Sequence, residues 1–228
     1  MIPKRIVIAL GATVAVTVVA TPAQAQSGLA ITADLGTTGV GVHLVTPLAS
    51  NLNGRVGFNY YQHDVDRRSG GINYQADARL QTFDALLDWY LIPSSRFRLT
   101  GGVLYNGNDV SARTRPDADG TYTINGRRYA EALVGTLDAR VDFRRAAPYI
   151  GIGWGNALSP GKGWSFSGDL GAFYHGKGRV DVNFVCAGGP IVCPELTRDV
   201  DAERVRLSDT LSDYKFFPVL RASLSYQF

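Results

Sequence analysis

The chain has 228 residues, of which 45% are hydrophobic, 19% are charged and 11% are aromatic, and its net charge is +3. This length allows one or two domains with a sizeable core, and a chain so rich in aromatic residues and so weakly charged is not disordered. The mean hydropathy of −0.03 excludes a bundle of membrane helices, which needs several apolar runs of about 20 residues. A net charge this small also argues against a nucleic-acid-binding protein.

The first 25 residues have the pattern of a secretory signal peptide. Lys4 and Arg5 precede an apolar stretch over residues 6–20, and Ala23-Gln24-Ala25 supplies the small residues of a cleavage site. We predict cleavage after Ala25, which leaves residues 26–228 as one domain outside the cytoplasm. A membrane anchor is the alternative, but the apolar stretch is shorter than a helix that spans a bilayer.

From residue 29 onwards, apolar and polar residues alternate with a period of two, as in β-strands with one apolar and one polar face. Val40, Val42 and Leu44 illustrate the pattern near the start, and Leu220, Ala222 and Leu224 near the end. Turn-forming residues separate the runs. The pattern predicts an all-β antiparallel fold with about eight strands, at residues 29–46, 52–63, 72–91, 96–108, 137–155, 162–175, 178–186 and 214–228. Because the alternation shifts at Gly36, residues 29–35 form a separate strand in an alternative assignment.

Both a soluble β-fold and a transmembrane barrel fit this alternation. The predicted strands are longer than the roughly 5–6 residues usual in soluble proteins, and a membrane span needs about 9–11. Aromatic residues gather near the strand ends, where a membrane barrel has its interfacial girdles: Trp89, Tyr90, Tyr105, Trp154, Trp164, Tyr174, Tyr226 and Phe228. These features favour a transmembrane barrel with its polar face towards the lumen, and leave a soluble periplasmic lipid-binding barrel as an alternative.

Charged residues on the polar face are predicted to pair inside the lumen. If residues 91–95 form a turn, Asp88 and Arg98 face each other across two strands. Asp84, Asp169 and Arg221, with Arg55, would neutralise further charge in this narrow space. The other interpretation is that these charges line a narrow pore, for which the many inward-facing glycines would leave room.

Residues 107–145 carry many charges of both signs, which indicates a solvated segment. Its Arg113, Arg115, Arg127 and Arg128 could contact lipopolysaccharide phosphates, because guanidinium groups pair bidentately with phosphate. A plain solvated hairpin around Asn125-Gly126 is the simpler interpretation.

Cys186 and Cys193 enclose a Gly-Gly-Pro sequence that lets the backbone reverse. In an oxidising compartment we therefore expect a disulfide between them. Two cysteines at this spacing do not complete a zinc site, and we predict no metal and no cofactor. Residues 198–213, which follow, are the one helical candidate. Such a charged helix would cap or plug a barrel mouth, or lie as a solvated loop tethered near the disulfide.

The chain ends in Leu224-Ser225-Tyr226-Gln227-Phe228. A last strand that closes on Phe228, with the aromatic Tyr226 two places before it, resembles the sorting signal of bacterial outer-membrane β-barrel proteins. The resemblance is to the small barrels that include outer membrane proteins A, W and X. It implies a Gram-negative outer membrane, insertion by the barrel-assembly machinery, contact with outer-membrane lipid and lipopolysaccharide, and an even number of strands. With the eight strands given above and periplasmic termini, residues 107–138 would fall on the periplasmic side, against the habit of such barrels.

Some outer-membrane barrels are lipid-modifying enzymes, so the three histidines need an interpretation. None of His43, His63 and His175 lies in the His-x-Ser pair of the lipid A deacylase barrels. His175, Asp169 and Ser167 share one polar strand face, which we interpret as a hydrogen-bonded cluster in the lumen. The sequence thus predicts a non-enzymatic barrel without catalytic residues, with a structural or interaction role or a narrow pore, and leaves a lipid-modifying enzyme as the alternative.

Overall fold

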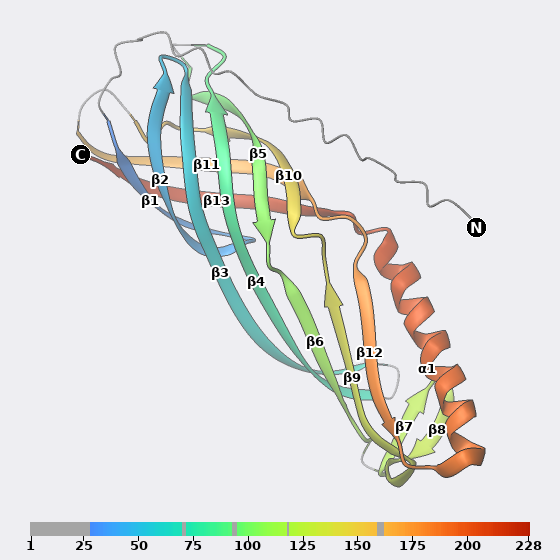
Figure 1. The fold of residues 1–228 in the computed structure, drawn as a ribbon. Helices are drawn as coiled ribbons and strands as arrows, with labels where there is room; N and C mark the ends of the chain where they lie inside the picture. Colours follow the sequence, from blue (N-terminus) through green and yellow to red (C-terminus); the bar gives the residue numbers. More distant parts are fainter. Residues whose placement is uncertain (1–27, 70–71, 93–94, 118, 159–161) are drawn as a thin grey trace, which may run out of the picture.

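A computed structural model describes residues 28–69, 72–92, 95–117, 119–158 and 162–228. The predicted signal peptide, residues 1–25, lies outside this part of the chain. Eight strands pair side by side in an antiparallel ring (Figure 1), in which each strand contacts the next and the last returns to the first. In ring order they are β1 (Ala30–Gly36), β2 (Gly39–Ala49), β3 (Leu52–Ser69), β4 (Ile72–Trp89), β5 (Phe97–Asn106), β10 (Ala146–Trp154), β11 (Gly163–Tyr174) and β13 (Phe216–Gln227). The prediction of an eight-stranded antiparallel barrel is confirmed.

The membership of the ring differs from the sequence-based assignment in three places. Residues 29–46 are not one strand but the hairpin β1–β2, which reverses just after Gly36. Gly39 has a φ of +99°, and a Cβ there would lie 2.4 Å from the Tyr60 carbonyl oxygen, so this reversal requires glycine. Residues 137–155 divide into β9 (Val134–Asp142) and β10, and β12 (Arg179–Cys186) lies outside the ring.

The β1–β2 hairpin also decides the sidedness of the connections. It reverses the direction of every later strand, so the facing strand ends Ala49 and Leu52, Trp89 and Phe97, and Trp154 and Gly163 lie at the same end as the two termini of the barrel. The long segment between β5 and β10 lies at the opposite end. The conflict that the sequence left open over residues 107–138 therefore came from a miscounted strand, and the fold has the short and long connections of an outer-membrane barrel.

The same sheet continues beyond the ring, and we call this part of the chain the extension (Figure 1). The far halves of β3 and β4 continue into it and are joined by β6 (Asp109–Arg115), β9 and β12. The helix α1 (Gly189–Ser212) lies along β12, and the hairpin of β7 (Thr121–Ile124) and β8 (Arg127–Ala130), followed by the short helix η1 (Glu131–Leu133), lies at the far end.

The predicted disulfide between Cys186 and Cys193 is present and ties the end of β12 to the first turns of α1. The helix begins at Gly189, nine residues before the predicted start, because Pro190 suits a first helical turn. It neither plugs the barrel nor lies free in solvent, since it packs on the extension through β12 and β7. Within the described residues, no helix has the length and apolarity needed to cross a membrane.

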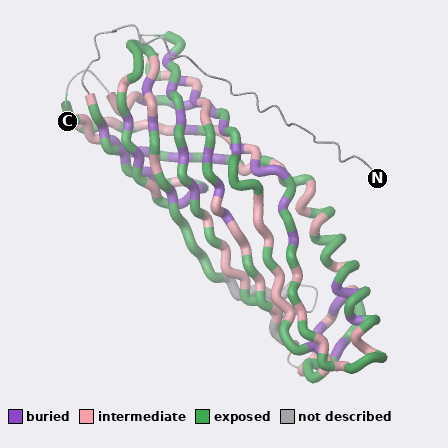
Figure 2. Tube along the Cα trace, viewed as in Figure 1, coloured by how far each residue is buried: buried purple, intermediate pink, exposed green. Residues whose placement is uncertain are grey.

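Buried and exposed residues alternate along the ring strands (Figure 2). Bands of aromatic side chains bound the exposed apolar face at both ends. On the adjacent strands β11 and β13, Trp164 lies opposite Tyr226 and Tyr174 lies opposite Phe216. The ten residues between these levels rise about 34 Å along a strand, which a tilt of about 40° reduces to about 25 Å, the usual height of the apolar band of such barrels.

The exposed face of β4 changes its polarity where the strand leaves the ring. Within the ring, the odd-numbered Phe83 and Leu87 are apolar and exposed. In the extension, the odd-numbered Asp77 and Arg79 occupy the same face of the same strand. Because the pleat fixes which face a residue occupies, the switch marks the level at which this face passes from lipid to water.

The opposite face of β4 changes in the reverse sense. Its even-numbered residues are the buried, polar Asp84 and Asp88 in the ring, and the apolar Ala76 and Ala78 in the extension. The extension is therefore built as a water-soluble sheet with a covered apolar face, whereas the ring is built for lipid.

We predict that arginine on the odd-numbered face of β4 is costly only within the ring. Ala85→Arg, at mid-height between Phe83 and Leu87, should lower the free energy of unfolding by about 2–4 kcal/mol, because the charge meets hydrocarbon. Gln81→Arg, exposed on the same face near the outer end of the ring, should cost only about 0–1 kcal/mol. Denaturant unfolding in lipid vesicles, followed by tryptophan fluorescence, measures both, and equal costs would contradict the assignment of the lipid-facing band.

Candidate functional site

The lumen contains a cluster of four charged side chains near the end of the barrel that holds the termini. Arg55 donates hydrogen bonds to Asp169 (Nη1–Oδ2 3.1 Å) and to Asp88 (Nη2–Oδ1 3.1 Å). Arg98 donates to Asp169 (Nη2–Oδ1 2.7 Å), and its Nε lies 3.4 Å from Asp88 Oδ1. Thr100 supplies Asp88 with a further hydrogen bond of 2.7 Å. All four charged side chains are almost fully buried, so two guanidinium groups and two carboxylates balance each other across the lumen.

A second cluster surrounds His43, nearer the middle of the barrel. The ring nitrogens of His43 contact the carboxylates of Asp34 and Asp84, the latter at 2.8 Å. Arg221 donates to Asp84 (Nη2–Oδ2 3.1 Å), and Asn59 donates to the same oxygen at 3.2 Å. These side chains come from strands β1, β2, β3, β4 and β13, so the network ties more than half of the ring together.

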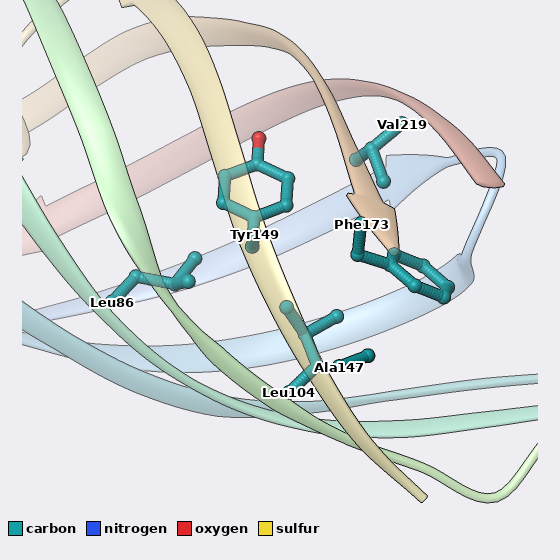
Figure 3. Packing of buried hydrophobic residues seen from close by; sticks show 6 residues of the cluster. All are labelled: Leu86, Leu104, Ala147, Tyr149, Phe173 and Val219. Carbon is teal, nitrogen blue, oxygen red and sulfur yellow. The ribbon is translucent and has the colours of Figure 1, made fainter. Parts of the chain in front are cut away.

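Apolar side chains fill the lumen towards the extension. Figure 3 shows this group, to which five strands of the ring contribute: Leu86, Leu104, Ala147, Tyr149, Phe173 and Val219. Between the polar side chains, the structure leaves a void of about 10 Å³ beside Arg55, Asp88 and Arg98. A void of this size holds at most about one water molecule.

Neighbouring side chains occupy the space beside inward glycines of the barrel. A Cβ on Gly57 would lie 2.1 Å from Cδ2 of His43, and one on Gly153 would lie 2.8 Å from Cζ of Arg98. Glycine at these positions makes room for an imidazole and a guanidinium group in a narrow ring. The room that the sequence suggested for a pore is therefore taken up by the charged network.

A groove of about 510 Å³ lies in the extension between α1 and the apolar face of the sheet, and we call it the helix groove. The helix contributes a stripe that includes Val200, Leu207 and Leu211, and the sheet contributes Ala76, Val110, Ala112, Leu137, Ala139, Val141, Phe143 and Val182. Glu203 and Arg204 lie at its border, and each forms an ion pair within α1.

A polar pocket of about 500 Å³ shares the Phe143 side chain with the helix groove. It contains more cations than anions, since Arg144, Arg145, Lys177 and Arg179 line it together with a single carboxylate, Asp142. We call it the basic pocket. His175 and Tyr174 complete its lining, which places it where β11 leaves the ring.

Two crystal structures of Acinetobacter baumannii proteins are similar to this chain. CarO2 aligns over 88% of this chain and 98% of its own with a TM-score of 0.57 and 19% identity, and CarO over 87% and 97% with a TM-score of 0.55 and 20% identity. A major outer membrane protein from Thermus thermophilus aligns with a TM-score of 0.46 and 16% identity, over 88% of this chain and 98% of its own. No family model and no curated protein matches the sequence. The fold is that of an outer-membrane β-barrel.

The charged residues that the sequence singled out all lie inside this barrel. Asp88, Arg98 and Asp169 meet in the first cluster, and Asp84 and Arg221 meet in the second. Asp88 lies opposite Thr100 rather than Arg98, whose side chain reaches it diagonally. Sequence reasoning did not single out Asp34, because its strand was merged with the next one; the shift of alternation at Gly36 is the signal that could have revealed it.

The expected cluster of His175, Asp169 and Ser167 does not form. Asp169 is engaged by Arg55 and Arg98, whereas His175 packs edge-on against Phe143 with ring centres 4.4 Å apart. Buried His175 Nδ1 has no hydrogen-bond partner among the described residues. In the described part of the chain, no group of three or more acidic, histidine or cysteine side chains is arranged to hold a metal ion.

The arginines considered for lipopolysaccharide contact lie in the extension, and three of them have carboxylate partners there. Arg113 pairs with Asp138 at 3.1 Å and Arg128 with Asp119 at 3.5 Å, while Arg127 contacts Glu195 of α1. The side chain of Arg115 lies outside the described part. These ion pairs favour the interpretation of a solvated, self-neutralised segment.

Asp199 of α1 is the point at which the β7–β8 hairpin docks on the helix. Its carboxylate accepts hydrogen bonds from Asn125 (Nδ2–Oδ1 3.0 Å) and from the Tyr129 hydroxyl. These bonds, from Asn125 first and then Tyr129, lower the pKa of Asp199 below its usual value of 3.8. Because the folded state binds this proton less readily than the unfolded state, the carboxylate stabilises the docked hairpin above about pH 4.

We predict that removing Asp169 destabilises the barrel strongly, because Asp169→Ala leaves Arg55 and Arg98 buried with too little negative charge. The cost should be about 3–5 kcal/mol. Asp138→Ala breaks the exposed ion pair with Arg113 and should cost about 0–1 kcal/mol. The urea midpoint of each reconstituted variant measures the difference, and an Asp169→Ala barrel as stable as the control would contradict the role of the cluster.

We also predict that the hairpin loosens in acid. As the pH falls through the lowered pKa of Asp199, protonation weakens its hydrogen bonds, so amide protection factors in β7 and β8 should be high at pH 6 and decrease below about pH 4. Asp199→Asn should lower protection already at pH 6. Asp201→Asn, on an exposed position of the same helix, is the control and should behave like the unchanged chain. If the amide protection of Asp199→Asn still decreased in acid as in the unchanged chain, the titrating group would be a residue other than Asp199.

Proposed function

We propose that the chain is a non-enzymatic, non-conducting barrel of the outer membrane that carries the extension on the outer side as an interaction domain. The observation that carries the proposal is the filled lumen. Charged groups that conduct ions line a continuous water-filled path, whereas Arg55, Arg98 and Arg221 are buried and paired across this lumen. This arrangement supports a structural or interaction role over a narrow pore.

Two of the three histidines, His43 and His175, support a non-enzymatic role. An acyl-transfer site needs a serine beside a histidine that accepts its proton. His43 is fully buried, and carboxylates contact both of its ring nitrogens, so neither nitrogen is placed to activate a serine. His175 packs between the rings of Phe143 and Phe173. These surroundings count against the lipid-modifying enzyme that the sequence left as an alternative.

The exposed apolar band supports residence in a membrane rather than the soluble lipid-binding alternative. Ile150, Phe166 and Leu220 of neighbouring strands are 60–76% exposed, and a soluble protein rarely exposes so continuous an apolar surface. With the termini in the periplasm, the extension stands outside the cell. Tyr226 and Phe228 remain the proposed sorting signal for the barrel-assembly machinery.

Lipopolysaccharide is the proposed lipid partner at the outer rim. Arg145 donates a hydrogen bond to the hydroxyl of Tyr105, and its guanidinium group lies 5.8 Å from the centre of that ring. Tyr105 is half-exposed near the outer end of β5. An arginine held at this level is placed to pair with lipid phosphates.

Conductance in planar bilayers tests the closed lumen. The purified full chain should give no channel events above the protein-free background, whereas a general porin inserted in the same bilayers should conduct. Reproducible channels of one conductance would overturn the non-conducting proposal and would indicate that the lumen charges line a pore.

Trypsin added to intact cells tests the placement of the extension. The exposed arginines of α1, such as Arg204 and Arg206, should be cleaved while a periplasmic marker protein stays intact. Cleavage that requires disruption of the outer membrane would place the extension on the periplasmic side.

A further inference from the structure

The floor of the helix groove consists of small side chains in register across the sheet. Ala76 of β4 lies opposite Ala112 of β6, which lies opposite Ala139 of β9, and Ala139 lies opposite Val182 of β12. Short side chains here keep α1 from filling the space between itself and the sheet. Protein interiors normally leave few voids larger than a water molecule, whereas about 510 Å³ is the size of a small-molecule site.

The half of α1 farther from the barrel shows that the helix groove does not run along the whole helix. Leu196 is fully buried in the apolar cluster at the far end of the extension, and Val200, in the same cluster, marks the far end of the groove. Leu207 and Leu211, on the half nearer the barrel, belong to no such cluster and line the groove, and Leu207 is 37% exposed. The groove is thus open to a ligand along the part of α1 that approaches the barrel.

The basic pocket meets the groove at its barrel end. Phe143 lines both, and Gly178 lies against it, since a Cβ there would be 3.1 Å from Phe143, 3.2 Å from Val141 and 3.6 Å from Leu211. Four cationic side chains beside a single carboxylate give this pocket a positive charge, which suits an incoming anionic group.

We propose that the extension binds one long-chain fatty acid, with its acyl chain in the helix groove and its carboxylate in the basic pocket. An apolar slot that ends at a cationic pocket matches a molecule with one tail and one negative charge. The groove has the volume for a single chain, whereas phospholipids and lipid A present two or more. The proposal goes beyond the interaction role proposed above, and a conducting barrel would leave it untouched.

Binding of tritiated palmitate to the purified full chain in amphipol tests the proposal, with protein-free amphipol as the blank. The unchanged chain should bind palmitate saturably at one molecule per chain. Ala112→Trp places an indole on the groove floor and should weaken binding by about tenfold or more. Ser111→Trp puts the same side chain on the opposite, exposed face of β6 and should bind normally.

A second pair of variants keeps the test decisive if the floor variant fails to fold. Leu207→Trp fills the groove from the helix side, and Val205→Trp places tryptophan on an exposed part of α1. Leu207→Trp should lose palmitate and Val205→Trp should retain it, with folding of each checked by the gel shift on boiling and by circular dichroism. No saturable binding to the unchanged chain, or equal binding by both members of a folded pair, would overturn the proposal.

The carboxylate site has its own test. Lys177→Gln removes one of the four cations of the basic pocket, so palmitate affinity should fall by about tenfold, as for loss of a hydrogen bond to a charged group. Hexadecanol, which has the same chain without the charge, should bind Lys177→Gln and the unchanged chain equally. An equal loss for both probes would overturn the placement of the carboxylate.

Discussion

The structure depends on one constraint, which is that neighbouring side chains on a β-strand point to opposite faces. A strand that crosses a bilayer must therefore offer apolar residues to lipid at every second position, and its other face must be enclosed in a ring. When the same strand continues into water, the face that was apolar must become polar. Strand β4 meets both demands, with Phe83 and Leu87 in the ring and Asp77 and Arg79 on the same face of the extension. The enclosed face then needs a new cover, which α1 supplies.

A ring of eight strands is narrow enough for side chains to fill, and much of the filling here is polar, with a network of charged groups. Burying an ion is expensive unless other groups balance its charge and satisfy its hydrogen bonds. Asp169 meets this requirement by accepting from Arg55 and Arg98 at once, and Thr100 completes the bonding of Asp88. Glycines at positions 57 and 153 supply the space. Charge balance and close packing in the lumen are thus two aspects of one arrangement, because the Arg98 guanidinium group and the His43 imidazole fit only where Gly153 and Gly57 lack a side chain.

Alternation and turn residues were enough to predict the barrel, because a period of two is a local property that a sequence displays directly. Pairing was harder to predict. The reversal after Gly36 is so short that β1 and β2 resembled one strand, and this single hairpin left the sidedness of the loops open and hid Asp34. The extension was missed because alternation does not say which face is covered: Ala139 and Val141 alternate with charged residues as a barrel strand does. His175 and Asp169 share a face, yet arginines from two other strands engage Asp169.

The way in which α1 is held explains why a groove remains beneath it. The helix is fixed at its far end by the Cys186–Cys193 disulfide and by the bonds of Asp199 to the hairpin, and at its near end by the chain that leads into β13. Its distance from the sheet is therefore set at the ends and not by the residues between them. At the far end Leu196 and Val200 fill that distance, but near the barrel the sheet offers alanines at positions 112 and 139. Because α1 is held at both ends, it does not settle onto these alanines, and they keep an apolar space open beside the basic pocket. Larger residues at the same positions would close that space.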